Sequence, residues 1–234
     1  MKRVLILTAE RTGTGHKSSA NAIENNLKDL GYETMQIDSF TTMGKLGMLL
    51  ENSYIPITTK CPILFYIPFL FTQMWPGAMH YSIYLKFKKR FKKVIDEFKP
   101  DLIISVHAMF NGAVSRFIKN ENLNIPFYVN VIDLVNPPKT WFNKDADAFF
   151  VPTEKVKESF VSKGFNSDNI VVSGFPIRTD IKRRIEPKSI DGKVNILLVN
   201  PSVNLKKSIK FVKEVSKLDN ANVSVICRKR WKAL

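Results

Sequence analysis

A histidine stands where a glycine-containing loop gives way to a helix. The loop reads Thr12-Gly13-Thr14-Gly15-His16, between an apolar run at residues 4–7 and apolar residues at helical spacing from 20 to 30. An imidazole at the beginning of a helix tends to stay neutral and able to accept a proton, because the helix dipole opposes a further positive charge. We predict that His16 is a general base for a hydroxyl group; a tight turn with a capping histidine is the alternative. The acceptor is expected to lie against loop residues Gly13, Thr14 and Gly15.

Two further polar residues follow apolar runs later in the chain. Asp133 comes after residues 127–132, and His107 comes after residues 102–106. If these runs are parallel strands, both side chains lie at the carboxyl edge of the sheet, where open α/β folds bind their ligands. Asp133 is then placed to pair with His16 and orient its ring. Capping of the next turn is the alternative for each residue.

An apolar insertion at residues 39–83 interrupts the order of elements. Residues 61–85 contain no Lys, Arg, Asp or Glu, and residues 86–93 then supply six cations. Prolines argue against a spanning helix, because a helix buried in lipid must complete its own backbone hydrogen bonds. Apolar and aromatic residues beside a basic helix favour docking in a membrane interface. The residues assigned to this surface are Phe65, Tyr66, Phe69, Phe71, Trp75, Lys88, Lys89, Arg90, Lys92 and Lys93.

The net charge of +15 over 234 residues requires a surface that attracts phosphates, either of anionic lipid or of nucleic acid. No nucleic-acid motif accompanies the basic run, so nucleic acid is the less favoured partner. A buried proline-rich connection beside a solvated helix is the other alternative. Cys61 and Cys227 have no metal-binding spacing, which indicates neither a zinc site nor a disulfide framework and favours a reducing, cytoplasmic compartment. The short apolar amino terminus does not predict a secretory signal.

The elements that must position these residues alternate between strand and helix. Mostly apolar runs are expected to form strands at 4–7, 102–106, 127–132, 148–151 and 170–173, and residues 33–37 are expected to form a further strand. Helical periodicity marks residues 20–30, 87–98, 113–118 and 156–160, with Thr153 as an N-cap. This pattern predicts an α/β fold, a doubly wound Rossmann-like parallel sheet covered on both faces, over residues 1–180.

The rest of the chain starts a second unit. Residues 181–193 are polar and basic and are expected to form a linker. Residues 194–234 predict a strand, a helix and a strand, which together are too few to bury a core of their own. We therefore expect this segment to be the incomplete start of another domain. It must pack on the first domain, meet a partner chain or stay poorly ordered.

Four ordered blocks resemble the monogalactosyldiacylglycerol synthase and processive diacylglycerol glucosyltransferase family. They are the opening strand with Thr14-Gly15-His16, the stretch Pro100-Asp101 to Ser105-Val106-His107, the stretch from Ile132-Asp133-Leu134 through Thr140-Trp141-Phe142 to Pro152-Thr153, and Gly174-Phe175-Pro176-Ile177-Arg178. The resemblance implies a GT-B fold of two Rossmann-like domains. It also implies metal-independent, inverting transfer of a hexose from a UDP-sugar to diacylglycerol, with no further cofactor.

In that scheme the amino-terminal domain holds the lipid acceptor, and His107, Asp133 and Trp141 shape the acceptor cleft. The chain is expected to work at the inner face of the cell membrane, bound peripherally to anionic lipid and diacylglycerol. It is expected to be inactive alone and to need the nucleotide-sugar domain, possibly from a separate chain. The alternative is a non-catalytic lipid-binding module derived from such an enzyme. Pro138-Lys139, where the family has a histidine, and Asn200-Pro201-Ser202, where it has glycines, favour that alternative.

Overall fold

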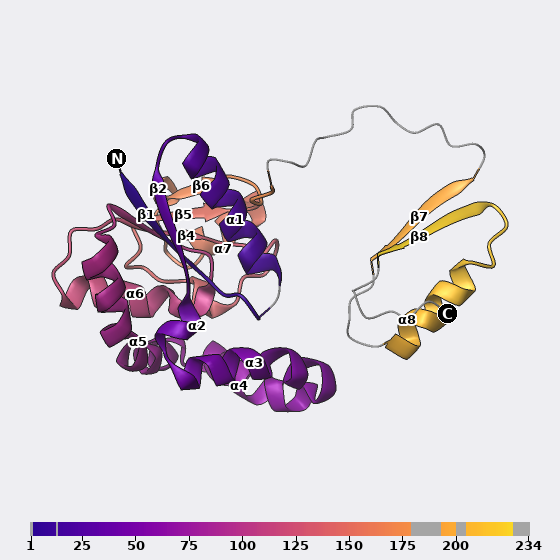
Figure 1. The fold of residues 1–234 in the computed structure, drawn as a ribbon, viewed down its shortest axis with the longest axis horizontal. Helices are drawn as coiled ribbons and strands as arrows, with labels where there is room; N and C mark the ends of the chain where they lie inside the picture. The colour runs from indigo at the N-terminus through magenta and orange to yellow at the C-terminus, as the bar shows by residue number, and fades with distance from the viewer. Residues whose placement is uncertain (1, 13, 179–192, 200–204, 227–234) are drawn as a thin grey trace. The chain divides into compact units, whose positions relative to one another are not determined.

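The computed structural model describes residues 2–12, 14–178, 193–199 and 205–226, and it divides into two compact units at residue 181 (Figure 1). The predicted linker, residues 181–193, lies outside the described residues except for Lys193. The assignment of the second unit to a nucleotide-sugar domain stays a prediction.

The first unit is built on a six-stranded, all-parallel sheet in the order β2-β1-β3-β4-β5-β6. Its strands are β1 (Arg3–Thr8), β2 (Glu33–Asp38), β3 (Leu102–Ser105), β4 (Phe127–Asn130), β5 (Ala148–Val151) and β6 (Ile170–Val172). The register places Leu7 of β1 beside Ser105 of β3, which in turn pairs with Val129 of β4. The predicted doubly wound parallel sheet is therefore confirmed.

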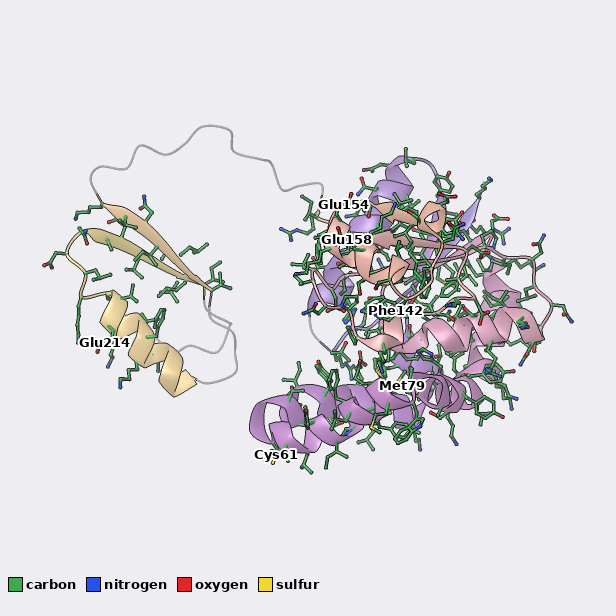
Figure 2. The ribbon with its side chains drawn as sticks, turned by 180° about the vertical axis from the view of Figure 1, so that it is seen from behind. Cys61, Met79, Phe142, Glu154, Glu158 and Glu214 are labelled. Atoms are coloured by element: carbon green, nitrogen blue, oxygen red, sulfur yellow. The ribbon has the colours of Figure 1, made fainter. Side chains whose placement is uncertain are left out.

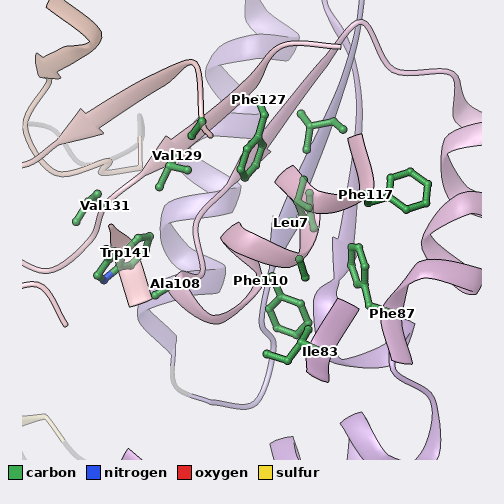
Figure 3. Close-up of a cluster of buried hydrophobic side chains, with 14 of the residues drawn as sticks. Leu7, Ile83, Phe87, Ala108, Phe110, Phe117, Phe127, Val129, Val131 and Trp141 are labelled. Carbon is green, nitrogen blue, oxygen red and sulfur yellow. The ribbon is translucent and has the colours of Figure 1, made fainter. Parts of the chain in front are cut away.

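Helices cover both faces of this sheet, because alternate side chains of each strand point to opposite sides. Val4 and Ile6 pack with Ala20 of α1 (Thr14–Asp29). Leu5 and Leu7 belong to the larger cluster on the other face. That cluster also contains residues of α5 (Pro76–Phe98), η1 (Ala108–Phe110), α6 (Asn111–Asn120), η2 (Lys139–Trp141) and α7 (Glu154–Val161) (Figure 3). A last 3-10 turn, η3 (Ser167–Asn169), precedes β6.

The insertion between β2 and α5 is helical. It forms α2 (Ser39–Thr42), α3 (Lys45–Lys60) and α4 (Pro62–Met74), with Pro56 and Pro68 inside the last two helices. Helices α3 and α4 contact each other and project past the sheet, with Cys61 at their tip (Figures 1 and 2). Among the described residues, no helix has both the length and the apolar character needed to cross a bilayer.

The insertion leaves much of its apolar surface exposed. Ile63, Ile67 and Met74 of α4 are 78%, 65% and 60% exposed. The alternative of a buried proline-rich connection is therefore wrong for these side chains. In contrast, Phe87 and Phe91 of the basic helix α5 are fully buried and stack on each other. Both lie on the apolar face that the helical periodicity of residues 87–98 predicted.

The second unit has two parallel strands, β7 (Val194–Val199) and β8 (Ala221–Ile226), joined through α8 (Leu205–Val215). Its strands pair from Val194 with Ala221 to Val199 with Ile226. Apolar side chains such as Leu197 and Phe211 are about three-fifths exposed, at 61% and 59%. Two strands and one helix leave these side chains without a full core.

Candidate functional site

His16 is the third residue of α1 and is half-buried at the carboxyl edge of the sheet. Its Nδ1 lies 2.7 Å from the carbonyl oxygen of Val106, which follows β3. A carbonyl only accepts hydrogen bonds, so Nδ1 carries the proton and donates it, which leaves the lone pair of Nε2 free. Burial lowers the pKa of His16, against the opposing effects of the Val106 carbonyl and the negative charge of Asp133. The ring is thus held neutral, in the tautomer that can accept a proton at Nε2.

His107 packs directly behind His16. The two ring centroids are 4.3 Å apart, and His107 is 5% exposed. Its Nδ1 accepts a 3.4 Å hydrogen bond from the backbone N–H of Met109, and the edge of Phe40 meets its ring. Burial, and then the proximity of His16, lower the pKa of His107 well below its usual range. His107 therefore packs against the His16 ring and positions it, and its assignment to the acceptor cleft stays a prediction.

Asp133 lies close enough to His16 for its charge to raise the pKa of that residue, but its hydrogen-bond partner is different from the one predicted. The indole Nε1–H of Trp141 donates to Oδ2 of Asp133. The His16 ring is instead oriented by the Val106 carbonyl. Trp141 is 1% exposed and holds the Asp133 carboxylate; its part in shaping an acceptor cleft stays a prediction.

The loop that precedes His16 is held by a residue that sequence reasoning missed. Oε1 of Glu51, in α3, accepts hydrogen bonds from the backbone N–H groups of Glu10 (2.9 Å) and Arg11 (2.7 Å). Arg11 also donates to Asn52 at 2.7 Å. Glu51 is 2% exposed, and no periodicity in the insertion marks it as a ligand of a loop forty residues away.

Asp38 completes an acidic group beside this loop. It ends β2, and its Oδ1 accepts a hydrogen bond from the backbone N–H of Phe40 at the beginning of α2. Burial, together with the nearby Glu51 and Glu10 carboxylates, raises the pKa of Asp38 to about 6. Asp38 follows a predicted strand, so the rule on the carboxyl ends of strands could have found it, although this strand is less apolar than the run that precedes Asp133.

Several buried polar atoms at this edge lack a hydrogen-bond partner. They are the hydroxyl oxygens of Thr8 and Thr12 and Nδ2 of Asn130, at the ends of β1 and β4 and in the first loop. Buried polar groups are nearly always satisfied in native proteins, so this edge is suited to a polar ligand or water. Within the described part of the chain, no group of three or more His, Cys, Asp or Glu side chains is arranged to hold a metal ion.

The predicted loop contacts are described in part. Gly15 is exposed, and a Cβ at this position would meet no atom within 4 Å, so the space beside it is open. Gly13 and the side chain of Thr14 lie outside the described residues. Their assignment to acceptor binding stays a prediction.

Most of the predicted membrane residues are exposed on the insertion and α5. Tyr66, Phe69, Phe71 and Trp75 are 58%, 37%, 46% and 53% exposed, whereas the side chain of Phe65 lies outside the described residues. On α5 the exposed stripe runs from the apolar Tyr81 and Leu85 to the cations, among them Lys88, Lys89 and Arg90.

Part of this positive charge is already paired. Lys92 lies 2.8 Å from Glu121, and Lys93 lies 3.7 Å from Glu97. The guanidinium of Arg90 lies against Gly44 at the start of α3. Lys88 and Lys89 are exposed as well, and the ammonium of Lys88 lies 5.4 Å from the centroid of the Tyr84 ring.

Comparisons with known proteins agree with this architecture. Residues 16–177 match the family model of monogalactosyldiacylglycerol (MGDG) synthase. The processive diacylglycerol β-glucosyltransferases of Bacillus mycoides KBAB4 and Bacillus subtilis 168 are 27% and 26% identical. Each match covers 97% of this chain, and 60% and 62% of the two relatives. The chain thus spans about three-fifths of their length.

Solved structures show the same fold at low identity. Acinetobacter baumannii MurG matches with a TM-score of 0.57 and 16% identity, over 98% of this chain and 60% of its own. The lipopolysaccharide outer core galactosyltransferase WaaB matches with a TM-score of 0.56 and 12% identity, over 96% and 68%. The fold is therefore that of the GT-B glycosyltransferases. Since the family model covers more than half of its residues, the chain belongs to the monogalactosyldiacylglycerol synthase family.

Proposed function

We propose that this chain supplies the lipid-acceptor half of a glycosyltransferase that moves a hexose from a UDP-sugar to diacylglycerol at a membrane surface. The proposal rests on the tautomer and the protonation state of His16. Its Nδ1 is bound to the Val106 carbonyl, so a neutral ring presents an unprotonated Nε2 at the carboxyl edge of the sheet. The two Bacillus relatives are named diacylglycerol β-glucosyltransferases, which supports the choice of acceptor.

In the proposed reaction, Nε2 of His16 takes the proton of the diacylglycerol hydroxyl as its oxygen bonds to the anomeric carbon. The bond from that carbon to the UDP oxygen breaks, and UDP leaves with the electron pair. The imidazolium that forms is stabilised by the Asp133 carboxylate, which Trp141 holds in place. The UDP-sugar would be bound by a nucleotide-sugar domain, of which residues 194–234 are the proposed beginning. That domain, or a separate chain that carries it, is the proposed partner.

The proposed membrane contact is the exposed apolar face of α3 and α4, with the basic stripe of α5 beside it. Apolar side chains enter the headgroup region, and each cation near the surface contributes about 1 kcal/mol with anionic lipid. This surface supports peripheral attachment to the inner, anionic face of the cell membrane. Vesicle flotation of the chain tests it: we expect binding that increases with anionic lipid and weakens in Lys88→Gln/Lys89→Gln. Equal flotation on neutral and anionic vesicles would contradict the role of the cations.

Turnover of a UDP-sugar with diacylglycerol tests the catalytic proposal, with the chain supplied together with its nucleotide-sugar half. His16→Asn keeps an amide donor for Val106 but removes the base, so kcat should fall roughly 10²- to 10⁴-fold. Ser18→Ala, on an exposed position of the same helix, is the matched control and should leave kcat unchanged. An unchanged rate in His16→Asn would rule out the general base.

A non-catalytic lipid-binding module is the second candidate function. Pro138-Lys139 and Asn200-Pro201-Ser202 replace residues that the family uses for binding, and this favours it. The module predicts binding to diacylglycerol-containing vesicles with no sugar transfer in the presence of any nucleotide-sugar half. Transfer that depends on His16 would exclude it.

A further inference from the structure

A cavity of about 360 Å³ lies apart from the His16 site, between the beginning of α5, helix α6 and residues 142–145. Its walls include Gly77, His80, Gly112, Arg116, Asn143 and Lys144. No residue of the His16 site lines it, so whatever binds here does not compete for the proposed base.

Positive charge surrounds this cavity. Arg116 and Lys119 of α6 and Lys144 of the segment after η2 line it, against one carboxylate, Asp145. The charged ends of Arg116 and Lys144 also lie 5.1 Å and 5.8 Å from the ring centroids of Tyr81 and Phe165. The first turn of α5 also borders it, and the side chain of Trp75 makes no capping hydrogen bond to that turn. The amide groups at the start of a 23-residue helix thus add a partial positive charge to the same space.

His80 supplies a buried polar atom without a partner at the wall of the cavity. The residue is 8% exposed, and its Nε2 is buried without a hydrogen-bond partner. Its ring bonds to the carbonyl of Ala108, so this bond is donated by the other nitrogen, Nδ1. Gly112 allows the ring this position, because a Cβ there would lie 2.3 Å from Nδ1. A buried polar atom without a partner costs stability and indicates a missing ligand atom.

We propose that this cavity binds a phosphate group, carried either by a soluble phosphate ester or by the headgroup of an anionic phospholipid. The cations and the α5 amide groups neutralise the phosphate oxygens. Trp75, directly before α5, belongs to the exposed apolar surface of the insertion, so a headgroup could enter from the proposed membrane side. The soluble ester requires no membrane, and therefore phosphate binding does not rest on the proposed function.

Binding is coupled to a proton on His80. Burial lowers the pKa of the His80 imidazole to about 4, so the ring is neutral when the cavity is empty. A phosphate oxygen needs a donor, and Nε2 supplies one only after it takes up a proton. The other charged residues that line the cavity with His80 are Arg116 and Lys119 from α6, and Lys144 and Asp145 from the segment after η2. The bound anion raises the pKa of His80, so binding favours uptake of a proton by the ring.

Titration of the full chain with inorganic phosphate and with glycerol 3-phosphate, followed by calorimetry and by NMR of the His80 ring, tests the proposal. Arg116 and Lys144 are exposed, so Arg116→Gln/Lys144→Gln keeps the fold while removing two charges. We expect its phosphate affinity to be lower by roughly tenfold or more, since charge-assisted hydrogen bonds to phosphate are the strong ones. Lys88→Gln/Lys89→Gln removes the same charge outside the cavity and should change phosphate affinity less than about twofold.

Vesicles of phosphatidylcholine with and without phosphatidylglycerol separate the two sources of phosphate. If Arg116→Gln/Lys144→Gln loses binding to the anionic vesicles, the headgroup is the source. If it loses only soluble phosphate, the ester is the source. Equal affinities of this variant and the wild-type chain for every probe, or phosphate binding that leaves the His80 resonances unmoved, would overturn the proposal.

Discussion

The hydrogen bond from Trp141 to Asp133 makes a quantitative prediction about the site. Trp141→Phe keeps an aromatic ring at a position that is 1% exposed but removes the Nε1–H that reaches Oδ2 of Asp133. A hydrogen bond to a charged group contributes about 1.5–3 kcal/mol. The smaller ring also leaves a cavity of roughly 40 Å³, which at ~24 cal/mol per Å³ costs about 1 kcal/mol. We therefore expect the free energy of unfolding to fall by roughly 2.5–4 kcal/mol.

A double-mutant cycle separates the hydrogen bond from the cavity. Asp133→Asn keeps an acceptor oxygen and removes the charge, so the cycle of Trp141→Phe and Asp133→Asn reports the charge-assisted part of the bond. We expect a coupling energy of about 1 kcal/mol in urea unfolding followed by circular dichroism, and Asp145→Asn, an exposed carboxylate nearby, should show none. A coupling energy near zero would refute a charge-assisted hydrogen bond between Trp141 and Asp133.

Asp133→Asn can also be tested through the pKa of His16. Because the Asp133 charge raises the pKa of His16, Asp133→Asn should lower that pKa further, as measured by NMR titration of the imidazole. Asp145→Asn is the control and should leave the His16 titration in place. A His16 pKa that rises in Asp133→Asn would mean that the carboxylate does not face the ring.

Three further predictions concern the surroundings of the site. The pKa of Asp38 is raised to about 6, so the folded state binds a proton that the unfolded state has released, and stability falls as the pH rises from about 4 to 6. Asp38→Asn should therefore raise Tm relative to wild type at about pH 8 and not at about pH 4. If the Tm values of the two proteins differ by the same amount at every pH, the prediction is wrong. Phe87→Ala should cost about 3–5 kcal/mol of stability, whereas Tyr66→Ala should cost less than about 0.5 kcal/mol and weaken vesicle flotation instead. Gly47→Ala should lower stability by about 1–3 kcal/mol, since a Cβ there would lie 1.9 Å from the Phe40 carbonyl oxygen. An unchanged thermal melt would show that the connection between α2 and α3 can move to admit the Cβ without loss of stability.

The strands and the helices that cover them were predictable because buried parallel strands are continuous apolar runs and the helices between them repeat at 3.6 residues. β1, β3 and β5 fall within two residues of the expected limits, and Thr153 caps α7 through a hydrogen bond to the N–H of Val156. The insertion was identified by its composition but not resolved into helices. Pro56 and Pro68 lie inside α3 and α4, where local rules disfavour proline, and apolar residues on all sides hide the helical period.

The site was predictable in its location but not in its contacts. The rule that ligands bind at the carboxyl ends of parallel strands places His16, His107 and Asp133 together, and the structure brings them together. The rule says nothing about which groups pair. Val106 binds His16 through its backbone carbonyl, which every residue possesses, so no residue type could reveal that hydrogen bond.

The hydrogen bonds of Glu51 were the least predictable contacts of the site. They connect the helix of the proposed membrane surface with the loop that leads to the proposed base. Glu51 lies in α3, whose neighbouring residues Met48, Leu49 and Leu50 are 43%, 65% and 45% exposed on the proposed membrane surface. The same residue accepts the backbone hydrogen bonds of Glu10 and Arg11, in the loop that leads to His16. Two hydrogen bonds to a buried carboxylate are too costly to break without a replacement. The position of the first loop therefore depends on α3, the helix that also carries part of the proposed membrane surface.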